Sequence, residues 1–532
     1  MNAKLIEFDD KARQKLMEGI NIVAKAVGST LGPRSRNVAL DQYGGTDLPP
    51  TILHDGVSVA RAINLKDPHA DMGARLLKNV AIKTNEIAGD GTTTATVLTQ
   101  AIIQESLKAV ASGYNPMLLK QEIELAGIIV LANLEKLAKK ITKEEEKEQI
   151  ATISSSDPYI GKLVATALAK VGNNGVLTVE EGRGFETTIE YKQGMEIDRG
   201  YLSPYFKTDE EKGEAVIEEP FILLSDKKFT DQYELAPFLN KFLQESKSKN
   251  LVIFASEVAE EGMATLVINK LNGNLNVVAI QAPAFGDRRM EELEDIAILT
   301  GGHPILIDSG RELKSVEMTE LGRADKVVVS QSKTVIVNGR GNKKAIEKRI
   351  SDLGSLIKHS ITDYDREQKE QRTANLAGKI AVINVGAATE IELKEKKERV
   401  IDAVNATKAA IEEGIVAGGE ITYYYLASKA PEMAQEAFST IGGHIIHESL
   451  KKPLKKILEN SGFDYAEKLK ELSGKEYPFG IDVIDGEIKD MIKVGIIDPV
   501  KVTRSALENA ISIATMILTT DTLITDLPEE VK

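Results

Sequence analysis

Apolar residues recur at helical spacing near both ends of the chain. The clearest stretch, residues 9–27, carries large apolar side chains at intervals of four, three and four residues: Leu16, Ile20, Val23 and Val27. Acidic residues open this stretch and Gly28 follows it, which are typical signals for the start and the end of a helix. The same periodicity predicts helices over 70–88, 92–111, 116–139, 432–460 and 503–517, and short strands near 37–41 and 51–54.

The middle of the chain has a different pattern. From about residue 175, the apolar runs FILLS, NLVIFAS, NVVAIQA and PILIDS alternate with helical stretches, which predicts an α/β unit. A strand and a long charged helix follow after about residue 379. The segments near both termini share the helical periodicity of apolar residues, so we expect one domain built from both termini with the α/β unit inserted into it. The charge run KEEEKE at 143–148 is interpreted as a solvated helix face or a boundary.

Composition narrows the class of protein. A chain of 532 residues contains about three to five structural units. Its 67 basic and 81 acidic residues give a formal charge of −14, which argues against nucleic acid as the main partner. The absence of cysteine excludes disulfides and thiol nucleophiles. No signal-peptide pattern opens the chain, and no apolar run approaches the ~20 residues of a membrane span, so we expect a soluble cytoplasmic protein with no membrane partner.

The segment AGDGTTTATVL at 88–98 is the strongest local indication of chemistry. Its glycines and threonines precede an apolar helix, so backbone N–H groups, the helix dipole and hydroxyl donors converge as they do around bound phosphate. Asp90 would repel a bare phosphate and is therefore interpreted as a ligand for Mg²⁺ that accompanies a nucleotide. No GxxxxGK[ST] motif occurs in the chain. An ordinary glycine-rich turn with threonine caps is the alternative.

Three isolated acids complete the candidates for hydrolysis. Asp55, Asp402 and Asp498 lie far apart in the sequence, and metal-dependent hydrolysis needs one carboxylate for the metal and another for the water. The sequence alone cannot bring these positions together.

Two helical segments carry less specific patterns. His444, His447 and Glu448 share one helix face, but HxxHE matches no zinc motif and no third distant ligand is evident, so we interpret them as solvated or packed side chains. The helix around 261–271 is apolar over more than one side. It is either buried all round or carries a second apolar surface for a partner.

A series of segments, taken in chain order, matches a known family. They are LGPRSRNV (31–38), HDGVSVA (54–60), AGDGTTTATVL (88–98), GYNPMLLK (113–120), DRGYLSPYF (198–206), APAFGDRR (282–289), GRADKVVVS (322–330), VGAATEIELKEKKERVIDA (385–403), EEGIVAGG (412–419) and GIIDPVKVTRSAL (495–507). Together they closely resemble the group I chaperonins of the GroEL type. The resemblance covers nearly the whole chain and implies an ATP-driven assembly of two stacked seven-membered rings that encloses non-native polypeptides.

The resemblance also implies a multidomain, GroEL-like fold. An all-α equatorial domain would comprise residues 1–136 and 413–532, a small α+β intermediate domain residues 137–192 and 379–412, and an inserted α/β apical domain residues 193–378. The equatorial domain would bind ATP with Mg²⁺, and K⁺ is a further candidate cation. Asp402 would be the hydrolytic carboxylate on the intermediate domain, so hydrolysis would require domain closure, and Asp55 would assist near the metal and the water.

The family's binding residues carry over position by position. Asp90 would bind Mg²⁺. The nucleotide-binding residues would be Thr30, Leu31, Gly32, Pro33, His54, Asp90, Gly91, Thr92, Thr93, Thr94, Gly419, Asp482, Val483, Ile484 and Asp498. Non-native polypeptides and a small ring-shaped co-chaperonin lid would bind apical residues, namely Tyr201, Tyr205, Phe206, Leu239, Met263, Val267 and Ile268.

The chain departs from the family pattern at several positions. His54 replaces a lysine before Asp55, Glu420 replaces the third glycine of AGGG, and Lys379 stands where a hinge glycine is usual. The chain stops at DLPEEVK without a Gly-Met-rich tail. We therefore expect an ATP-hydrolysing folding chamber, with a ring-shaped holdase of weak ATP turnover as the alternative. A metal-dependent phosphotransferase that uses GDGTTT on a small substrate is a third hypothesis.

Overall fold

The structure is a computed structural model, and it describes residues 4–41, 51–53, 55–141, 143–172, 176–182, 184–209, 212–230, 232–358 and 363–526. The chain divides into two compact units. Unit 1 comprises residues 1–169, 181–187 and 385–532, and unit 2 comprises residues 170–180 and 188–384. The predicted insertion of one unit into another is confirmed, and the finer division into three domains stays a prediction.

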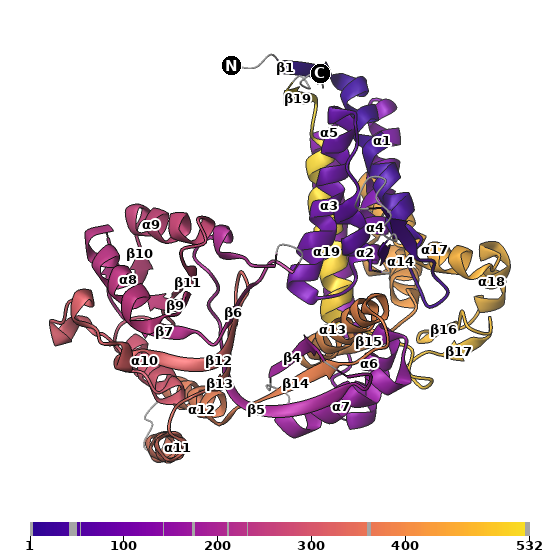
Figure 1. The fold of residues 1–532 in the computed structure, drawn as a ribbon. Coiled ribbons are helices and arrows are strands. Elements are labelled where there is room, and N and C mark those ends of the chain that lie inside the picture. Colours follow the sequence, from indigo (N-terminus) through magenta and orange to yellow (C-terminus); the bar gives the residue numbers. More distant parts are fainter. Residues whose placement is uncertain are drawn as a thin grey trace. The chain divides into compact units, whose positions relative to one another are not determined.

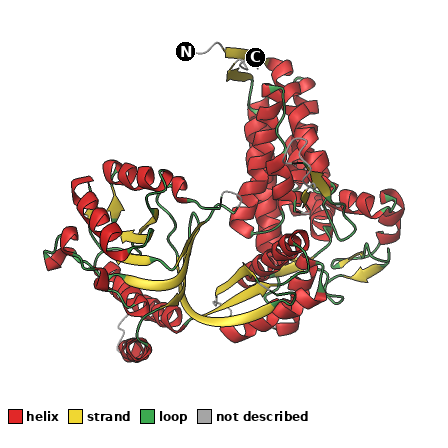
Figure 2. Ribbon diagram, in the orientation of Figure 1, coloured by secondary structure: helices red, strands yellow, loops and turns green. Residues whose placement is uncertain are grey.

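Helices dominate unit 1, and eight of them contribute to an extensive apolar core (Figures 1 and 2). They are α1 (Asp9–Gly28), α2 (Gly56–Ala62), α3 (Pro68–Ala88), α4 (Thr92–Ala111), α5 (Pro116–Leu137), α14 (Ile421–Met433), α16 (Ile441–Ser449) and α19 (Val500–Leu518). The predicted apolar faces are confirmed, because their members are buried: Leu16, Ile20, Val23 and Val27 on α1, and Ala506, Ala510, Ile513 and Ile517 on α19. Helices α1 and α3 touch at Gly19, where a Cβ would lie 1.8 Å from the Ala70 carbonyl oxygen.

Further elements complete unit 1. The other helices are α6 (Glu144–Ser155), α7 (Pro158–Val171), α13 (Glu390–Glu413), α15 (Gln435–Phe438), α17 (Lys452–Ser461) and α18 (Tyr465–Leu472). Four antiparallel strand pairs accompany them: β1 (Lys4–Phe8) with β19 (Thr522–Asp526), β2 (Val38–Leu40) with β3 (Thr51–Leu53), β15 (Ile415–Ala417) with β18 (Ile497–Pro499), and β16 (Phe479–Ile481) with β17 (Ile488–Asp490). The charge run at 143–148 forms the start of α6, as its interpretation as a helix face predicts.

The prediction of one helix over 432–460 is wrong. The segment contains the end of α14 and the separate helices α15, α16 and α17. Thr440 caps α16 by accepting a hydrogen bond from the Gly443 N–H, and Pro453 lies in the first turn of α17. Both are helix-start signals, so the apolar periodicity continues while the helix axis changes.

A nine-stranded sheet forms the centre of unit 2 (Figure 2). Its strands are β4 (Val176–Glu181), β5 (Thr188–Ile197), β6 (Ala215–Glu218), β7 (Phe221–Leu224), β9 (Asn250–Ala255), β11 (Asn276–Gln281), β12 (Gly322–Val329), β13 (Thr334–Gly339) and β14 (Lys379–Val385). The order is β11-β9-β7-β12-β13-β5-β14-β4, and β6 pairs with β12. Strands β7, β9 and β11 are parallel, as predicted for an α/β unit, and their residues are among the most buried of the chain.

The described part of unit 2 also contains five helices: α8 (Gln232–Ser246), α9 (Glu260–Leu271), α10 (Asp287–Thr300), α11 (Lys343–Lys358) and α12 (Asp363–Ala377). Short strands β8 (Lys228–Phe229) and β10 (Glu257–Val258) pair beside them, and single 3-10 turns lie at Pro204–Phe206, Ile307–Ser309, Leu313–Ser315 and Met318–Glu320.

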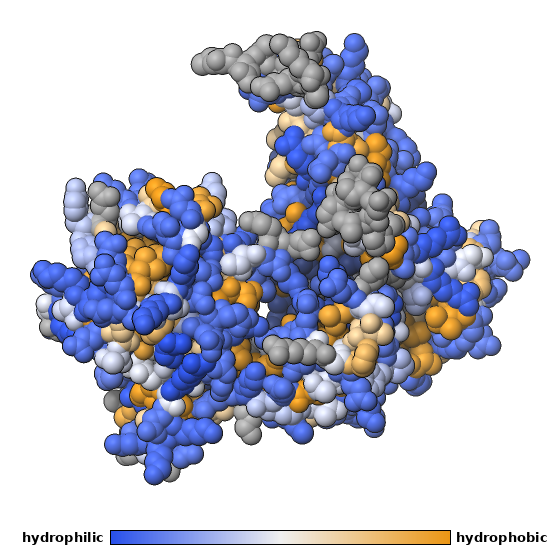
Figure 3. Space-filling view, viewed as in Figure 1, coloured by the Kyte–Doolittle hydropathy of each residue, from blue (hydrophilic) through white to orange (hydrophobic). Residues whose placement is uncertain are grey.

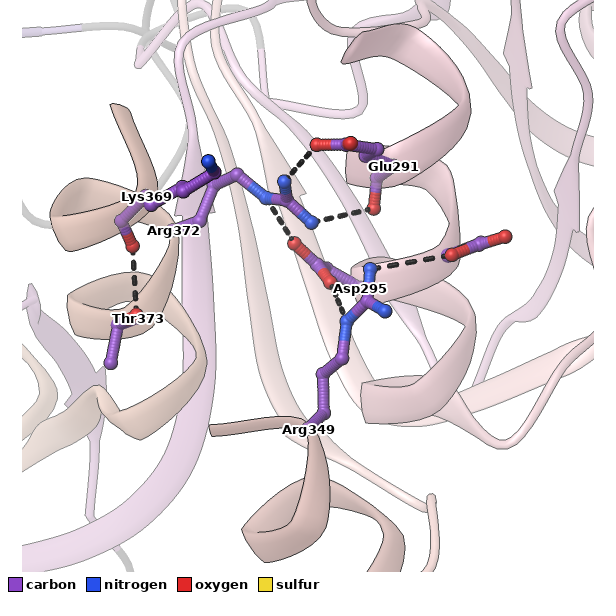
Figure 4. A network of polar contacts seen from close by, with 7 residues as sticks. Glu291, Asp295, Arg349, Lys369, Arg372 and Thr373 are labelled. Carbon is purple, nitrogen blue, oxygen red and sulfur yellow. Dashed lines mark hydrogen bonds and ion pairs between the residues drawn. The ribbon is translucent and has the colours of Figure 1, made fainter. Parts of the chain in front are cut away.

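One buried carboxylate ties three helices of unit 2 together (Figure 4). Asp295 of α10 is 2% exposed and accepts hydrogen bonds from the Nε atoms of Arg349 on α11 and Arg372 on α12, both at 2.7 Å. Arg372 also pairs with Glu291, and Arg349 with Glu294. Because both oxygens of Asp295 are used, its buried charge is compensated on two sides.

None of the helices in the described part of the chain combines the length and the apolar character that crossing a bilayer requires.

Candidate functional site

Two left-handed glycines shape the loop between α3 and α4. Gly89 has φ +70° and ends α3, and Gly91 has φ +81° and precedes the first turn of α4. A side chain at either position would be strained, so glycine is required here. Asp90 lies between them, and its Oδ1 accepts a hydrogen bond of 2.6 Å from the Gly91 N–H. The first turn of α4 then presents Thr92, Thr93 and Thr94, all of which are buried.

Asp55 is brought to this turn by a close contact between two helices. It caps α2, accepting a hydrogen bond from the Ser58 N–H at 2.8 Å. The next residue, Gly56, packs so tightly that a Cβ would lie 2.3 Å from Thr93 Oγ1 and 2.9 Å from Thr92 Oγ1. The start of α2 therefore abuts the N-terminus of α4, which places Asp55 and Asp90 close enough for their charges to interact.

Helix α13 supplies Asp402. The loop glycine Gly89 lies against this helix, since a Cβ on it would be 2.4 Å from Asn405 Cβ. Burial raises the pKa of Asp402 well above its ordinary value, and the charges of Asp90 and Asp55 raise it further. The pKa of Asp90 is raised as well, first by burial and then by Asp55. The structure thus brings Asp55 and Asp402, which the sequence left apart, to the loop that carries Asp90.

Strands β15 and β18 bring two further carboxylates to the site. Asp498 pairs with Val416 in the ladder, and Gly418 approaches it so closely that a Cβ would be 2.8 Å from Asp498 Oδ1. Glu420 is buried with φ +65°, a conformation that costs a non-glycine residue energy, and its Oε1 accepts a 2.5 Å hydrogen bond from Thr94 Oγ1. Burial raises the pKa of Glu420 to about 7, and burial together with the charge of Glu420 raises that of Asp498 well above its usual range.

The residues predicted to hold the nucleoside form a second part of the site, next to a buried apolar cluster. Leu31 and Val483 belong to one buried cluster, and Arg34 donates a hydrogen bond of 2.5 Å to the Ile484 carbonyl oxygen. Asp482 accepts hydrogen bonds from the Ile484 N–H and from Lys489 Nζ, so its loop is fixed. Thr30 joins both sides, because its Oγ1 lies 3.1 Å from Thr93 Oγ1.

The remaining predicted contacts are backbone positions or lie outside the described residues. Gly32 and Gly419 both have positive φ, +89° and +67°, and form turns, while Pro33 follows Gly32 on an exposed part of the turn. His54 lies outside the described residues, so the effect of this substitution stays a prediction. Lys379 pairs with Gln193 in the β14–β5 ladder, and its role as a hinge position also stays a prediction.

One contact of the site was missed. Ser154 of α6 donates a hydrogen bond of 3.2 Å to Asp90 Oδ2. The sequence offered no signal for it, because Ser154 belongs to a serine-rich helix end that is typical of capping.

The donor set suits a hard divalent cation. Asp90 and Asp55 offer carboxylate oxygens beside threonine hydroxyls, which are the ligands that Mg²⁺ prefers. The charges that raise the pKa values of Asp90, Asp402, Glu420 and Asp498 come from neighbouring carboxylates. A cation would relieve this repulsion, and the first turn of α4 would bind phosphate oxygens through its N–H groups and hydroxyls.

The predicted polypeptide-binding residues divide into buried and exposed positions. Phe206 is 0% exposed and Leu239 is 4% exposed, so these two belong to the core of unit 2 and not to its surface. Their predicted surface position is wrong for this conformation, because both pack in the interior around the sheet. Tyr201, Met263 and Val267 are partly buried against the same core. Tyr205 and Ile268 are well exposed.

Helix α9 is not buried all round. Only Gly262 and Leu266 are buried on it, whereas Ile268 is 56% and Leu271 is 66% exposed. The interpretation of complete burial is therefore wrong, and the helix carries an exposed apolar face. Hydrophobic surface gathers over the region of α9 in Figure 3.

The fold and the site define a class of protein: a helical unit whose helix α4 begins with threonines beside several buried acids, and an inserted α/β unit. The pattern of the TCP-1/cpn60 chaperonin family matches residues 23–528, so the chain belongs to this family. Its fold is similar to that of the chaperonin gp146 from bacteriophage EL 2 (Pseudomonas aeruginosa), solved in the presence of ATP-BeFx. Crystal form II has a TM-score of 0.70 at 22% identity and covers 99% of this chain and 100% of that chain. Crystal form I has a TM-score of 0.63 at 22% identity and covers 99% of both chains.

Proposed function

We propose that this chain is the subunit of an ATP-hydrolysing chaperonin that captures non-native polypeptides and promotes their folding. The observation that carries the proposal is the convergence of Asp55, Asp90 and Asp402 on the threonine-lined start of α4. Metal-dependent phosphoryl transfer needs this combination of groups: hydrogen-bond donors that hold the phosphate, a ligand for the metal, and a separate carboxylate that acts on the water.

Each acid has a distinct role in the proposed hydrolysis. Asp90 holds Mg²⁺, which would neutralise phosphate charge when bound, and Thr92, Thr93 and Thr94 orient the phosphate oxygens. Asp402 takes a proton from the attacking water, a role open to it because it is a separate carboxylate that does not hold the metal. Asp55, held in place as the cap of α2, orients the same water or the metal.

Asp402→Asn tests this assignment. The substitution keeps the shape of the side chain and removes the base, so we expect phosphate release to fall by about a hundredfold or more while the Kd for Mg-ADP changes little. Asp10→Asn is the matched control, because Asp10 is an exposed carboxylate of the same unit. Equal phosphate release from the wild-type and Asp402→Asn proteins would contradict the role of Asp402.

We assign the capture of non-native polypeptides to the exposed apolar side chains of α9. Tyr205, which is also exposed and matches a polypeptide-binding position of the family, is a further candidate. Burying an exposed aliphatic side chain stabilises a complex by roughly 1–2 kcal/mol, and several subunits acting on one chain add avidity. The proposed assembly is a homo-oligomer of two stacked seven-membered rings, and a small ring-shaped lid is its proposed partner. The double variant Ile268→Asp, Leu271→Asp should lose suppression of aggregation of a denatured test enzyme, whereas Leu356→Asp, at a 49% exposed position on α11, should keep it.

A ring-shaped holdase with weak ATP turnover is the second candidate. It is favoured by Glu420, whose carboxyl group accepts the hydrogen bond of a threonine that would otherwise face phosphate. Refolding of a denatured enzyme with and without ATP separates the two functions. ATP-independent protection without ATP-dependent recovery would identify the holdase.

A further inference from the structure

A cluster of metal-binding side chains lies in unit 1 on α16, and the proposed function does not use it. His444, His447 and Glu448 each place one ligand atom so that all three atoms lie within 4.8 Å of one another. The two imidazole rings are stacked at an interplanar angle of 25° with their centroids 5.9 Å apart. The Nδ1 atom of His447 lies 3.0 Å from Glu448 Oε1, a separation close to that of two ligands sharing one metal ion.

The environment of the cluster leaves one ligand atom without a hydrogen bond among the described residues and one side of the cluster open to solvent. Nδ1 of His447 is buried, and despite its distance to Glu448 it does not satisfy the geometry of a hydrogen bond within the described structure. His444 is exposed, which leaves the cluster open to solvent on one side.

In place of the interpretation from the sequence as solvated or packed side chains, we propose that His444, His447 and Glu448 bind a first-row divalent transition metal ion, with Zn²⁺ as the representative ion. Two imidazoles and a carboxylate are a ligand set that Zn²⁺ uses in sites with three protein ligands, where water completes the coordination. Imidazole ligands select such ions against Mg²⁺, so this site differs in chemistry from the all-oxygen site at the start of α4.

Lys451 is the competing cation. Its Nζ bonds Glu448 Oε1 at 2.7 Å, so a metal ion must displace the ammonium group or use the other carboxylate oxygen. Removing Lys451 should therefore strengthen metal binding. Nonspecific binding of Zn²⁺ to surface carboxylates would not respond in this way.

The test is calorimetric titration of chelator-treated full-length protein with Zn²⁺ in excess Mg²⁺. We expect one Zn²⁺ ion per chain. His444→Ala should weaken binding at least tenfold, and the double variant His444→Ala, His447→Ala should abolish it. His303→Ala, which changes a histidine of unit 2, is the matched control and should leave binding unchanged. Because His444 is exposed, its single variant tests the ligand role without disturbing the core.

Two further measurements decide the origin of any binding. Lys451→Met should tighten Zn²⁺ binding by about two- to fivefold, the amount expected from removing a partly exposed ion pair, while Lys455→Met should not. Titration with Co²⁺ should give visible absorption bands that are lost in His444→Ala. Absence of Zn²⁺ binding, or binding that is lost in Asp90→Asn and kept in the histidine variants, would overturn the proposal.

Discussion

Glu420 gives the proposed nucleotide site a dependence on pH that can be worked out from its environment. Burial raises the pKa of its carboxyl group to about 7, and its Oε1 is held by Thr94 where phosphate oxygens would bind. With this pKa, roughly nine-tenths of the group is neutral at pH 6 and roughly one-tenth at pH 8. A negative carboxylate repels a polyphosphate, so we expect only the neutral form to bind it. The apparent Kd then rises with the inverse of the neutral fraction, by about tenfold between pH 6 and pH 8.

Glu420→Gln isolates this effect. The amide keeps the shape of the side chain and an oxygen that accepts the Thr94 hydrogen bond, but it carries no charge. Calorimetric titration with Mg-ADP avoids hydrolysis and should give nearly equal Kd values for the two proteins at pH 6. At pH 8 the variant should bind about tenfold more tightly, because the neutral form of the wild type is then scarce.

The comparison between the two proteins removes the titration of the nucleotide and of the other site carboxyls. Glu432→Gln is the control, because Glu432 lies on the same helix and is exposed with its partner Lys429. This variant should follow the wild type at both pH values. If Glu420→Gln shows the same change of Kd with pH as the wild type, the carboxyl group of Glu420 does not limit nucleotide binding and the reasoning is refuted.

Two other predictions concern packing. Asp295→Asn leaves two half-buried arginines with a weaker partner and should destabilise unit 2 by about 2–3 kcal/mol, seen as a lower melting temperature, whereas Glu294→Gln at the exposed edge of the network should cost under about 1 kcal/mol. Gly56→Ala pushes a methyl group against Thr93 Oγ1 and should weaken Mg-ADP binding by about tenfold or more. Gly354→Ala, where a Cβ meets no atom within 4 Å, should leave the Kd unchanged.

Local patterns in the sequence predict the elements with one buried face. The apolar periodicity of α1 and α19 identifies residues that are buried in the structure, and the alternation of apolar runs and helices identifies the α/β unit. The start of α4 is also predictable, because glycine, threonine and a following apolar helix form one continuous segment. These signals are local, so a single sequence contains them.

Without the family resemblance, the sequence could not predict which distant residues lie close together at the site. Asp402 meets Asp90 only because α13 packs against the loop at Gly89. The same limit applies to burial, since Phe206 and Leu239 have the composition of a surface patch and the packing of core residues. The helix-start residues Thr440 and Pro453 divide the segment 432–460, for which apolar periodicity alone predicted one helix.

The discontinuous construction of unit 1 has a consequence for its synthesis on the ribosome. Helix α19 packs on α3, α4 and α5, and β19 pairs with β1, so the core closes only when the last residues have emerged. About 360 residues separate α5 from α19, which at roughly 5–20 residues per second is a delay of about 20–70 seconds. Unit 2, by contrast, is nearly continuous and can fold during translation. We expect ribosome-arrested chains ending near residue 450 to resist proteolysis in unit 2 and to be cleaved in unit 1, so that a newly made subunit is itself an aggregation-prone polypeptide.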